Sequence, residues 1–315
     1  MTNITVYNTL RREKELFVPI QPNHVSFYAC GVTVYDYCHI GHARAYVAFD
    51  CMRRIFEHFG YSVTYIQNFT DIDDKIIARA HQNKEDYQVL THRFIDAYHQ
   101  DMAALGIKPA SGYPKATEHI DEIITLIQSL LDDGVAYLNG ADICFEVERV
   151  KDYGKLSKKV LEELEAGARI DIGSGKKNPL DFVLWKGSKP DEPAWDSPWG
   201  SGRPGWHIEC SAMVEAMFGA EIDIHAGGED LIFPHHENEI AQSECGYKHP
   251  LARYWVHNGF VTIKSAKMSK SKGNFTTLRD LLDQFDGEVI RFFLCKTHYR
   301  HPLQFSLQRI EEAKQ

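Results

Sequence analysis

The stretch VSFYACGVTVYDYCHIGH, residues 25–42, predicts the fold of this chain more clearly than any other. Its first part, Val25 to Cys30, alternates in polarity and is rich in β-branched and aromatic residues, which predicts a strand ending before Gly31. Beyond His42, apolar residues recur at helical spacing, at Ala45, Ala48, Phe49, Met52, Ile55, Phe56 and Phe59. A strand, a turn and an amphipathic helix in this order indicate an α/β fold.

Two histidines lie at the start of this predicted helix. His39 and His42 are three residues apart, so they share one helical face, where unsatisfied backbone N–H groups and the helix dipole favour an anion. Gly41 between them leaves room for a base or a ribose. The pattern favours a phosphate site, although two histidines that only cap a helix would have the same spacing.

A second polar stretch, Lys267-Met268-Ser269-Lys270-Ser271, follows much later in the chain. With Lys264, Lys272 and Gly273 it forms a positively charged segment rich in hydrogen-bond donors, which suits a polyphosphate whose charge grows as pyrophosphate leaves. Taken by itself, this segment is better interpreted as a solvated basic loop. Together the two stretches predict a divided nucleotide site.

Composition agrees with an α/β protein that has an inserted module. The chain has 315 residues, 43% hydrophobic and 25% charged, enough for more than one mean-sized domain. No apolar run approaches a membrane span and the polar start lacks signal-peptide features, so we expect a cytoplasmic protein with no membrane contact. The net charge of −9 neither supports nor excludes a nucleic-acid partner, since lysines at 151, 155, 158 and 159 can form a local basic patch.

The seven cysteines do not indicate a disulfide framework, because their number is odd and no secretion signal precedes them. We expect Cys51, Cys144 and Cys295 to be small buried apolar residues, and Cys38 and Cys245 to be structural. Cys30 and Cys210 differ in their neighbours. Cys30 ends a predicted strand at the edge where open parallel sheets bind ligands, and Cys210 lies in a helix-like segment, residues 208–218.

The two polar stretches resemble the HIGH and KMSKS signatures of class I aminoacyl-tRNA synthetases. Three further stretches, TDIDDK at 70–75, GWHIECSAM at 205–213 and FPHHENE at 233–239, resemble cysteinyl-tRNA synthetases in particular. The resemblance implies ATP-dependent activation of L-cysteine and transfer of the cysteinyl group to the 3′ end of tRNA(Cys). It also implies that ATP contacts His39, Gly41, His42, Lys267, Ser269 and Lys270, with His39, His42, Lys267 and Lys270 catalytic and Mg²⁺ bound to ATP.

The resemblance further implies one Zn²⁺ per chain, held by Cys30, Cys210, His235 and Glu239 and taking the thiolate of the substrate as an additional ligand. These side chains are chemically suitable zinc ligands, and His235 and Glu239 are four apart after Pro234 and share a helical face. Spacing alone does not assemble the set, because the chain has no CxxC pair and no HExxH motif.

Thr70, Trp206 and Asp230 are the substrate neighbours that the resemblance implies, with Asp230 or a nearby polar group meeting the α-ammonium group and Trp206 forming an apolar wall. His225 follows a strand signal and could also face the site. Thr70, Trp206 and Asp230 each have a structural alternative to substrate contact. Thr70 and Asp230 could be helix caps, and Trp206 could be a core aromatic.

The family fold implied is a Rossmann-like parallel sheet with helices on both faces, split by an α+β connective insertion and followed by the start of a helical region. We expect the first catalytic half at 1–111, the insertion at 112–200, the second half at 201–262, and the lysine stretch with the helical start at 263–315. One polar helical stretch is expected from Asp73 to about Leu105, and a Lys/Pro/Gly-rich return at 176–205. Family members continue into an anticodon-binding domain, so we expect this chain to be truncated. We also expect a monomer.

Three alternatives remain from the sequence. A cysteine ligase acting on an amino sugar, of the mycothiol-pathway type, shares these motifs and has no anticodon domain. A non-catalytic synthetase paralogue usually loses one of the phosphate-binding stretches, and both are complete here. A zinc hydrolase is disfavoured because HExxH is missing.

Overall fold

A four-stranded parallel sheet forms the centre of the protein, in a computed structural model that describes residues 3–159, 175–263, 266–267 and 277–314. The strand order is β10-β9-β3-β4, with β3 at His24–Thr33, β4 at Ser62–Thr70, β9 at Ile222–Gly228 and β10 at Ala252–Asn258. Helix α1 (Ile40–His58) connects β3 to β4 on one side, whereas β9 pairs with β3 on the other. The strand order therefore reverses at β3, where sheets of this kind bind ligands.

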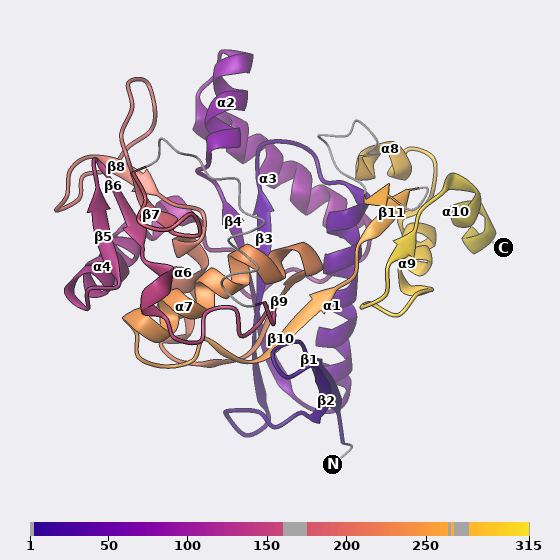
Figure 1. Ribbon diagram of the computed structural model, residues 1–315. Helices are drawn as coiled ribbons and strands as arrows, with labels where there is room; N and C mark the ends of the chain where they lie inside the picture. Colours follow the sequence, from indigo (N-terminus) through magenta and orange to yellow (C-terminus); the bar gives the residue numbers. More distant parts are fainter. Residues whose placement is uncertain (1–2, 160–174, 264–265, 268–276, 315) are drawn as a thin grey trace.

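Helices cover both faces of this sheet, as predicted (Figure 1). Helices α1 and α3 (Tyr87–Ala104) pack on one face, and α6 (Ile208–Phe218) and α7 (Glu237–Gly246) on the other. Side chains alternate along β3, so Phe27 and Ala29 belong to the first core while Tyr28 and Cys30 belong to the second. This alternation points Cys30 toward α6.

A β-bulge at the end of β3 fixes the position of Cys30. Ala29 pairs with Gln67 and Val32 with Phe69, so Cys30 and Gly31 together face the single residue Asn68. The Asn68 side chain accepts a hydrogen bond from the Gly31 N–H at 2.8 Å. A Cβ on Gly31 would lie 1.5 Å from the Asn68 carbonyl oxygen, so the bulge requires glycine.

The stretch expected to be one helix from Asp73 to Leu105 is two. Helix α2 (Asp74–Asn83) ends at Lys84, which has φ +54°, and Asp86 caps α3 by accepting from the Gln88 N–H. The prediction of a continuous helix is wrong between 84 and 86. The left-handed residue Lys84 and the new cap Asp86 mark a helix boundary. The spacing of apolar residues, on which the prediction rested, carries no information about such a boundary.

A second sheet, entirely antiparallel, has its own hydrophobic core beside α4 (Ile120–Asp132). Its strands follow in the order β5 (Ala136–Asn139), β6 (Asp142–Phe145), β7 (Phe182–Gly187) and β8 (Gly202–Pro204). The last two lie in the Lys/Pro/Gly-rich passage, where no strand was expected. Figure 1 shows this sheet to one side of the central one.

Short elements complete the two ends of the described chain. A hairpin of β1 (Thr5–Asn8) and β2 (Glu13–Leu16) precedes β3. After β10 come β11 (Val261–Ile263), β12 (Ala266–Lys267), α8 (Leu278–Leu282), α9 (Gly287–Cys295), β13 (Leu303–Gln304) and α10 (Leu307–Lys314). Among the helices of the described residues, none is both long and apolar enough to cross a membrane.

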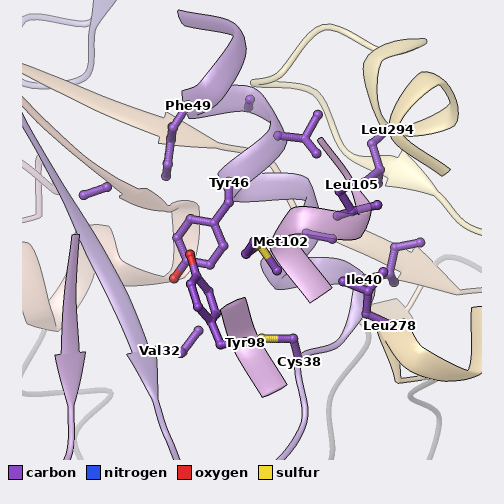
Figure 2. Packing of buried hydrophobic residues seen from close by; sticks show 14 of the residues in the cluster. Val32, Cys38, Ile40, Tyr46, Phe49, Tyr98, Met102, Leu105, Leu278 and Leu294 are labelled. Carbon is purple, nitrogen blue, oxygen red and sulfur yellow. The ribbon is translucent and has the colours of Figure 1, made fainter. Parts of the chain in front are cut away.

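The start of α1 is anchored in the core. Figure 2 shows Cys38 and Ile40 among Tyr98, Met102 and Leu278, which come from α3 and α8. Because the residues on either side of it are buried, His39 is held in place by packing.

Candidate active site and metal centre

Four buried side chains meet at the carboxyl end of β3. Cys30 lies at the bulge of β3, Cys210 on α6, Glu239 on α7, and His235 on the short π-helical segment Ile232–His236 that precedes α7. Each is at most 6% exposed. The structure thus brings together the four residues that the resemblance named as zinc ligands, from segments up to 209 residues apart.

The distances within this cluster suit a metal ion. The two sulfur atoms are 3.7 Å apart, and Cys210 Sγ is 3.7 Å from His235 Nε2. Glu239 Oε1 is 2.8 Å from His235 Nε2 and 3.5 Å from Cys30 Sγ. Two thiolates on a tetrahedral zinc ion would lie about 3.8 Å apart, given Zn–S bonds of about 2.3 Å. Two sulfur ligands, one imidazole and one carboxylate therefore fit zinc in chemistry, and the two sulfur atoms also fit it in spacing.

The same four groups also perturb one another's protonation. Burial raises the pKa of the Cys30 thiol. The hydrogen bond between Cys30 and Cys210 lowers the pKa of Cys210 to about 6. Burial lowers the pKa of His235, but the Glu239 carboxylate and Cys210 outweigh it and raise that pKa to about 10. Burial opposes ionisation of Glu239, yet the neighbouring histidines hold its pKa well below the usual value. The protons on Cys30 and His235 are those that a metal ion would replace.

A second group of possible ligands overlaps the first. His225 on β9 and His236 next to His235 also lie within metal-ligand distance of Cys30 and Glu239. His225 Nε2 is 2.9 Å from Glu239 Oε2, and His236 Nε2 is 3.3 Å from Cys30 Sγ. Since both groups share Cys30 and Glu239, one ion can occupy only one of them. The second group has only one thiol, so it offers a metal ion a less soft set of ligands than the first group does.

His39 and His42 cap helix α1. The His39 Nδ1 atom accepts hydrogen bonds from the N–H groups of Gly41 and His42, and His42 Nδ1 accepts from the His39 N–H. The rings stack with centroids 3.7 Å apart. A Cβ on Gly41 would lie 2.8 Å from the His39 ring, so this glycine makes room for the cap. The capping role that the sequence left open as an alternative is therefore present, at a helix N-terminus that favours anions.

The segment that follows the second motif contacts the first motif. Lys267 ends β12, and the next described residue, Thr277, pairs with His39 in an isolated β-bridge. The Leu278 N–H donates to the Cys38 carbonyl oxygen at 2.8 Å. Ser269 and Lys270 lie outside the described residues, as does the Lys267 side chain. The backbone that follows the lysine stretch thus leads to the start of α1.

Sequence comparison gives the family. Residues 16–315 match the profile of a family described as tRNA synthetases class I (C) catalytic domain. The chain belongs to this family. It is 60% identical to a cysteine–tRNA ligase of Magnetococcus marinus and 57% identical to one of Geobacter metallireducens, with 99% of this chain covered in each case. The chain spans 64% of the length of both relatives.

Solved structures confirm the fold of this class I synthetase domain. Methionyl-tRNA synthetase of Mycobacterium tuberculosis, in complex with methionyl-adenylate, superposes with a TM-score of 0.69 over 91% of this chain and 68% of that one, at 16% identity. A putative arginyl-tRNA synthetase from Campylobacter jejuni gives a TM-score of 0.62 over 92% of this chain and 66% of that one, at 14% identity. The Rossmann-like class I fold expected from the sequence is therefore confirmed.

The three expected substrate neighbours of this synthetase domain occupy different environments. The Thr70 hydroxyl donates to Glu209 Oε2 at 2.8 Å and is buried at the end of β4. Trp206 is 41% exposed and stacks on His235, with ring centroids 4.4 Å apart, so it is not a core aromatic. Asp230 is exposed beside Gly228 at the carboxyl end of β9.

Sequence reasoning missed the polar residues that surround the cluster. His207 Nδ1 lies 2.9 Å from His235 Nδ1, and burial together with His235 lowers the His207 pKa to about 3, which keeps that ring neutral. His236 Nδ1 lies 2.8 Å from His257 Nε2. Such outer partners orient metal ligands. His207 and His236 are inside the quoted stretches 205–213 and 233–239, but no spacing rule separates them from the ligands.

Proposed function

We propose that this chain activates L-cysteine with ATP to give cysteinyl-adenylate and pyrophosphate, and transfers the cysteinyl group to the 3′-terminal ribose of tRNA(Cys). The observation that supports it best is the buried cluster of Cys30, Cys210, His235 and Glu239 at the same strand-to-helix connection as His39 and His42. The relatives named cysteine–tRNA ligase add support over the part of their length that this chain spans.

Cys30, Cys210, His235 and Glu239 would hold one Zn²⁺. Bound zinc would supply a soft cation that coordinates the substrate thiolate in preference to a hydroxyl group. His207 would fix the orientation of the His235 ring through its 2.9 Å contact. The α6 helix and the β3 bulge would keep the two thiolates at their separation, since both are buried in packed elements.

This arrangement addresses the discrimination between cysteine and serine. The two amino acids differ by one atom, and a pocket that only fits shape rejects such a competitor weakly. Protein synthesis needs discrimination of about 10⁴ to 10⁵ unless an editing step is added. Recognition by coordination depends on the ionised sulfur, which serine lacks, so the cluster can reject serine without editing.

Three side chains would position the rest of the amino acid. Trp206 lies against His235 and would form an apolar wall beside the thiol. Asp230, at the carboxyl end of β9, would meet the α-ammonium group. Thr70 is held by its hydrogen bond to Glu209, so its own contact with substrate would be set by that buried carboxylate.

The nucleotide would bind across the two motifs. His39, Gly41 and His42 would meet the phosphates at the N-terminus of α1, while Lys267, Ser269 and Lys270 would neutralise the departing pyrophosphate. The cysteine carboxylate attacks the α-phosphorus in line, so the side chains act by positioning and charge rather than by forming a covalent intermediate. ATP would arrive with Mg²⁺ bound to its phosphate oxygens.

The remaining parts of the proposal concern the partners. Residues 112–200, the expected connective insertion, would contact the acceptor end of the tRNA. The described part of this region includes the antiparallel strands β5, β6 and β7. We expect a monomer.

Pyrophosphate exchange tests the proposed activity. Zinc-loaded protein should exchange pyrophosphate into ATP with cysteine, about 10⁴-fold less with serine, and not at all without an amino acid. Zinc content is measured on the same sample. Adding full-length tRNA(Cys) in one assay and an amino sugar in another then separates the synthetase from the amino-sugar ligase. No exchange in protein that holds one zinc per chain would contradict the proposal and favour a non-catalytic paralogue.

A further inference from the structure

A second pair of cysteines lies outside the site described above, where α1 meets α9. Cys51 of α1 and Cys295 at the end of α9 have their sulfur atoms 3.8 Å apart, although 244 residues separate them in sequence. Cys51 is half-buried and Cys295 is exposed, so the prediction that both are buried apolar residues is wrong. Oxidants in solvent can reach this pair.

The charges around the pair favour a thiolate on Cys51. Arg291 Nη2 lies 3.6 Å from Cys51 Sγ and also contacts the Asp50 carboxylate. A hydrogen bond from Cys295 lowers the pKa of Cys51 to about 6; burial and Asp50 oppose this, while the Arg291 charge adds to it. Arg44 is a further nearby cation for both sulfur atoms. The pKa of Cys295 is raised, chiefly by the same hydrogen bond. These shifts favour one thiolate and one thiol in the pair at neutral pH.

We propose that Cys51 and Cys295 form a reversible oxidation site, with Cys51 as the nucleophile toward a hydroperoxide and Cys295 as the resolving thiol. In the first step the Cys51 thiolate attacks one peroxide oxygen, the O–O bond breaks, and hydrogen peroxide gives Cys51 sulfenic acid and hydroxide. In the second step Cys295 sulfur attacks the Cys51 sulfur, the S–O bond breaks, and the hydroxyl group leaves as water with the Cys295 proton. Two thiols are oxidised and one peroxide is reduced.

The fold already holds the two helices in position for the second step. The Arg44 guanidinium on α1 donates to the carbonyl oxygens of Leu294, Thr297 and His298, which flank Cys295. A disulfide has an S–S bond of about 2.05 Å, so the sulfur atoms must approach by less than about 2 Å. The disulfide would tie α9 to the helix whose N-terminus contains the His39 cap.

Cys245 provides a matched control. It is half-buried like Cys51, but burial raises the pKa of its thiol. At pH 7 we expect iodoacetamide to modify Cys51 about tenfold faster than Cys245 in the folded protein, because the thiolate is the reactive form. The two rates should become similar in denaturant. Equal rates in the folded protein would overturn the proposal.

Peptide mapping tests the disulfide itself. Zinc-loaded protein is treated with a small excess of hydrogen peroxide, alkylated, digested and analysed by mass spectrometry. We expect a Cys51–Cys295 linked peptide that dithiothreitol removes, and the same peptide in Cys245→Ser. In Cys295→Ser, which changes an exposed side chain, Cys51 should instead form a sulfenic acid that dimedone traps. Folded wild-type protein that gives neither the linked peptide nor a dimedone adduct on Cys51 would contradict the assignment.

Discussion

Two pairs of cysteines in this domain have nearly the same geometry and opposite surroundings. The sulfur atoms of Cys30 and Cys210 are 3.7 Å apart, and those of Cys51 and Cys295 are 3.8 Å apart. In each pair the hydrogen bond between the thiols lowers the pKa of one member to about 6. The first pair is buried and the second is accessible to solvent.

The neighbours account for the difference in chemistry. The inner pair, Cys30 and Cys210, has an imidazole and a carboxylate within 4.8 Å, which can complete a metal coordination shell. The outer pair, Cys51 and Cys295, has Arg291 close by, and a guanidinium group stabilises a thiolate but cannot bind a cation. The sulfur separation alone therefore does not distinguish a metal site from a redox site. The charge and exposure of the surrounding groups do.

The largest expected effect separates the two pairs by metal content. Cys210→Ser should reduce zinc affinity by more than about 100-fold, because even outer partners of ligands usually contribute 10–100-fold. The affinity for cysteine should fall far more than that for ATP. The matched variant Cys295→Ser should retain one zinc per chain. Metal analysis after dialysis measures this, and equal zinc loss in both variants would remove the distinction between the pairs.

A second pair of variants tests which group of ligands holds the ion. His235→Gln should weaken zinc binding more than about 100-fold, whereas His236→Gln, beside Cys30 but outside the preferred group, should weaken it about 10–100-fold. Competition with a chromogenic chelator gives both affinities. The reverse order would assign the ion to Cys30, His225, His236 and Glu239.

The third prediction uses pH. Zinc must displace protons from Cys30, whose pKa burial raises, and from His235, whose pKa is raised to about 10. Both groups are protonated at pH 6 to 8, so zinc affinity should rise with pH, by about tenfold per unit for each proton displaced. Alkylation of Cys51 should instead level off above about pH 7, since its pKa is about 6. A zinc affinity that is independent of pH would contradict the protonation described for the inner pair.

The smallest expected effect concerns stability. Cys295→Ser exchanges an exposed thiol for a hydroxyl group and should change the free energy of unfolding by less than about 0.5 kcal/mol. Cys144→Ser places a hydroxyl group where the side chain is fully buried in β6, and should cost about 1–3 kcal/mol. Urea denaturation of the reduced proteins measures both. A large loss for Cys295→Ser would mean that the outer pair has a structural role.

Local patterns predicted a large part of the fold, whereas most of the candidate site residues came from the family resemblance. The strand and helix in residues 25–59 follow from side-chain periodicity, and β3 and α1 lie there. The expected helix at 208–218 coincides with α6. The strands β7 and β8 were missed because their short segments lie among proline, glycine and lysine residues, and their pairing with each other and with β6 is not visible in local spacing.

The sequence by itself determined that this is a parallel α/β domain with histidines at a helix start, because such features depend on residues within one or two turns of each other. The resemblance of five short stretches to one family then named the four possible zinc ligands. Only the tertiary structure decided which cysteines meet. Cys30 and Cys210 are 180 residues apart and Cys51 and Cys295 are 244 apart, so their neighbours, exposure and charge come from the packing of α1, α6 and α9 around the central sheet. Those long-range contacts place one pair among ligands and the other beside arginine in solvent.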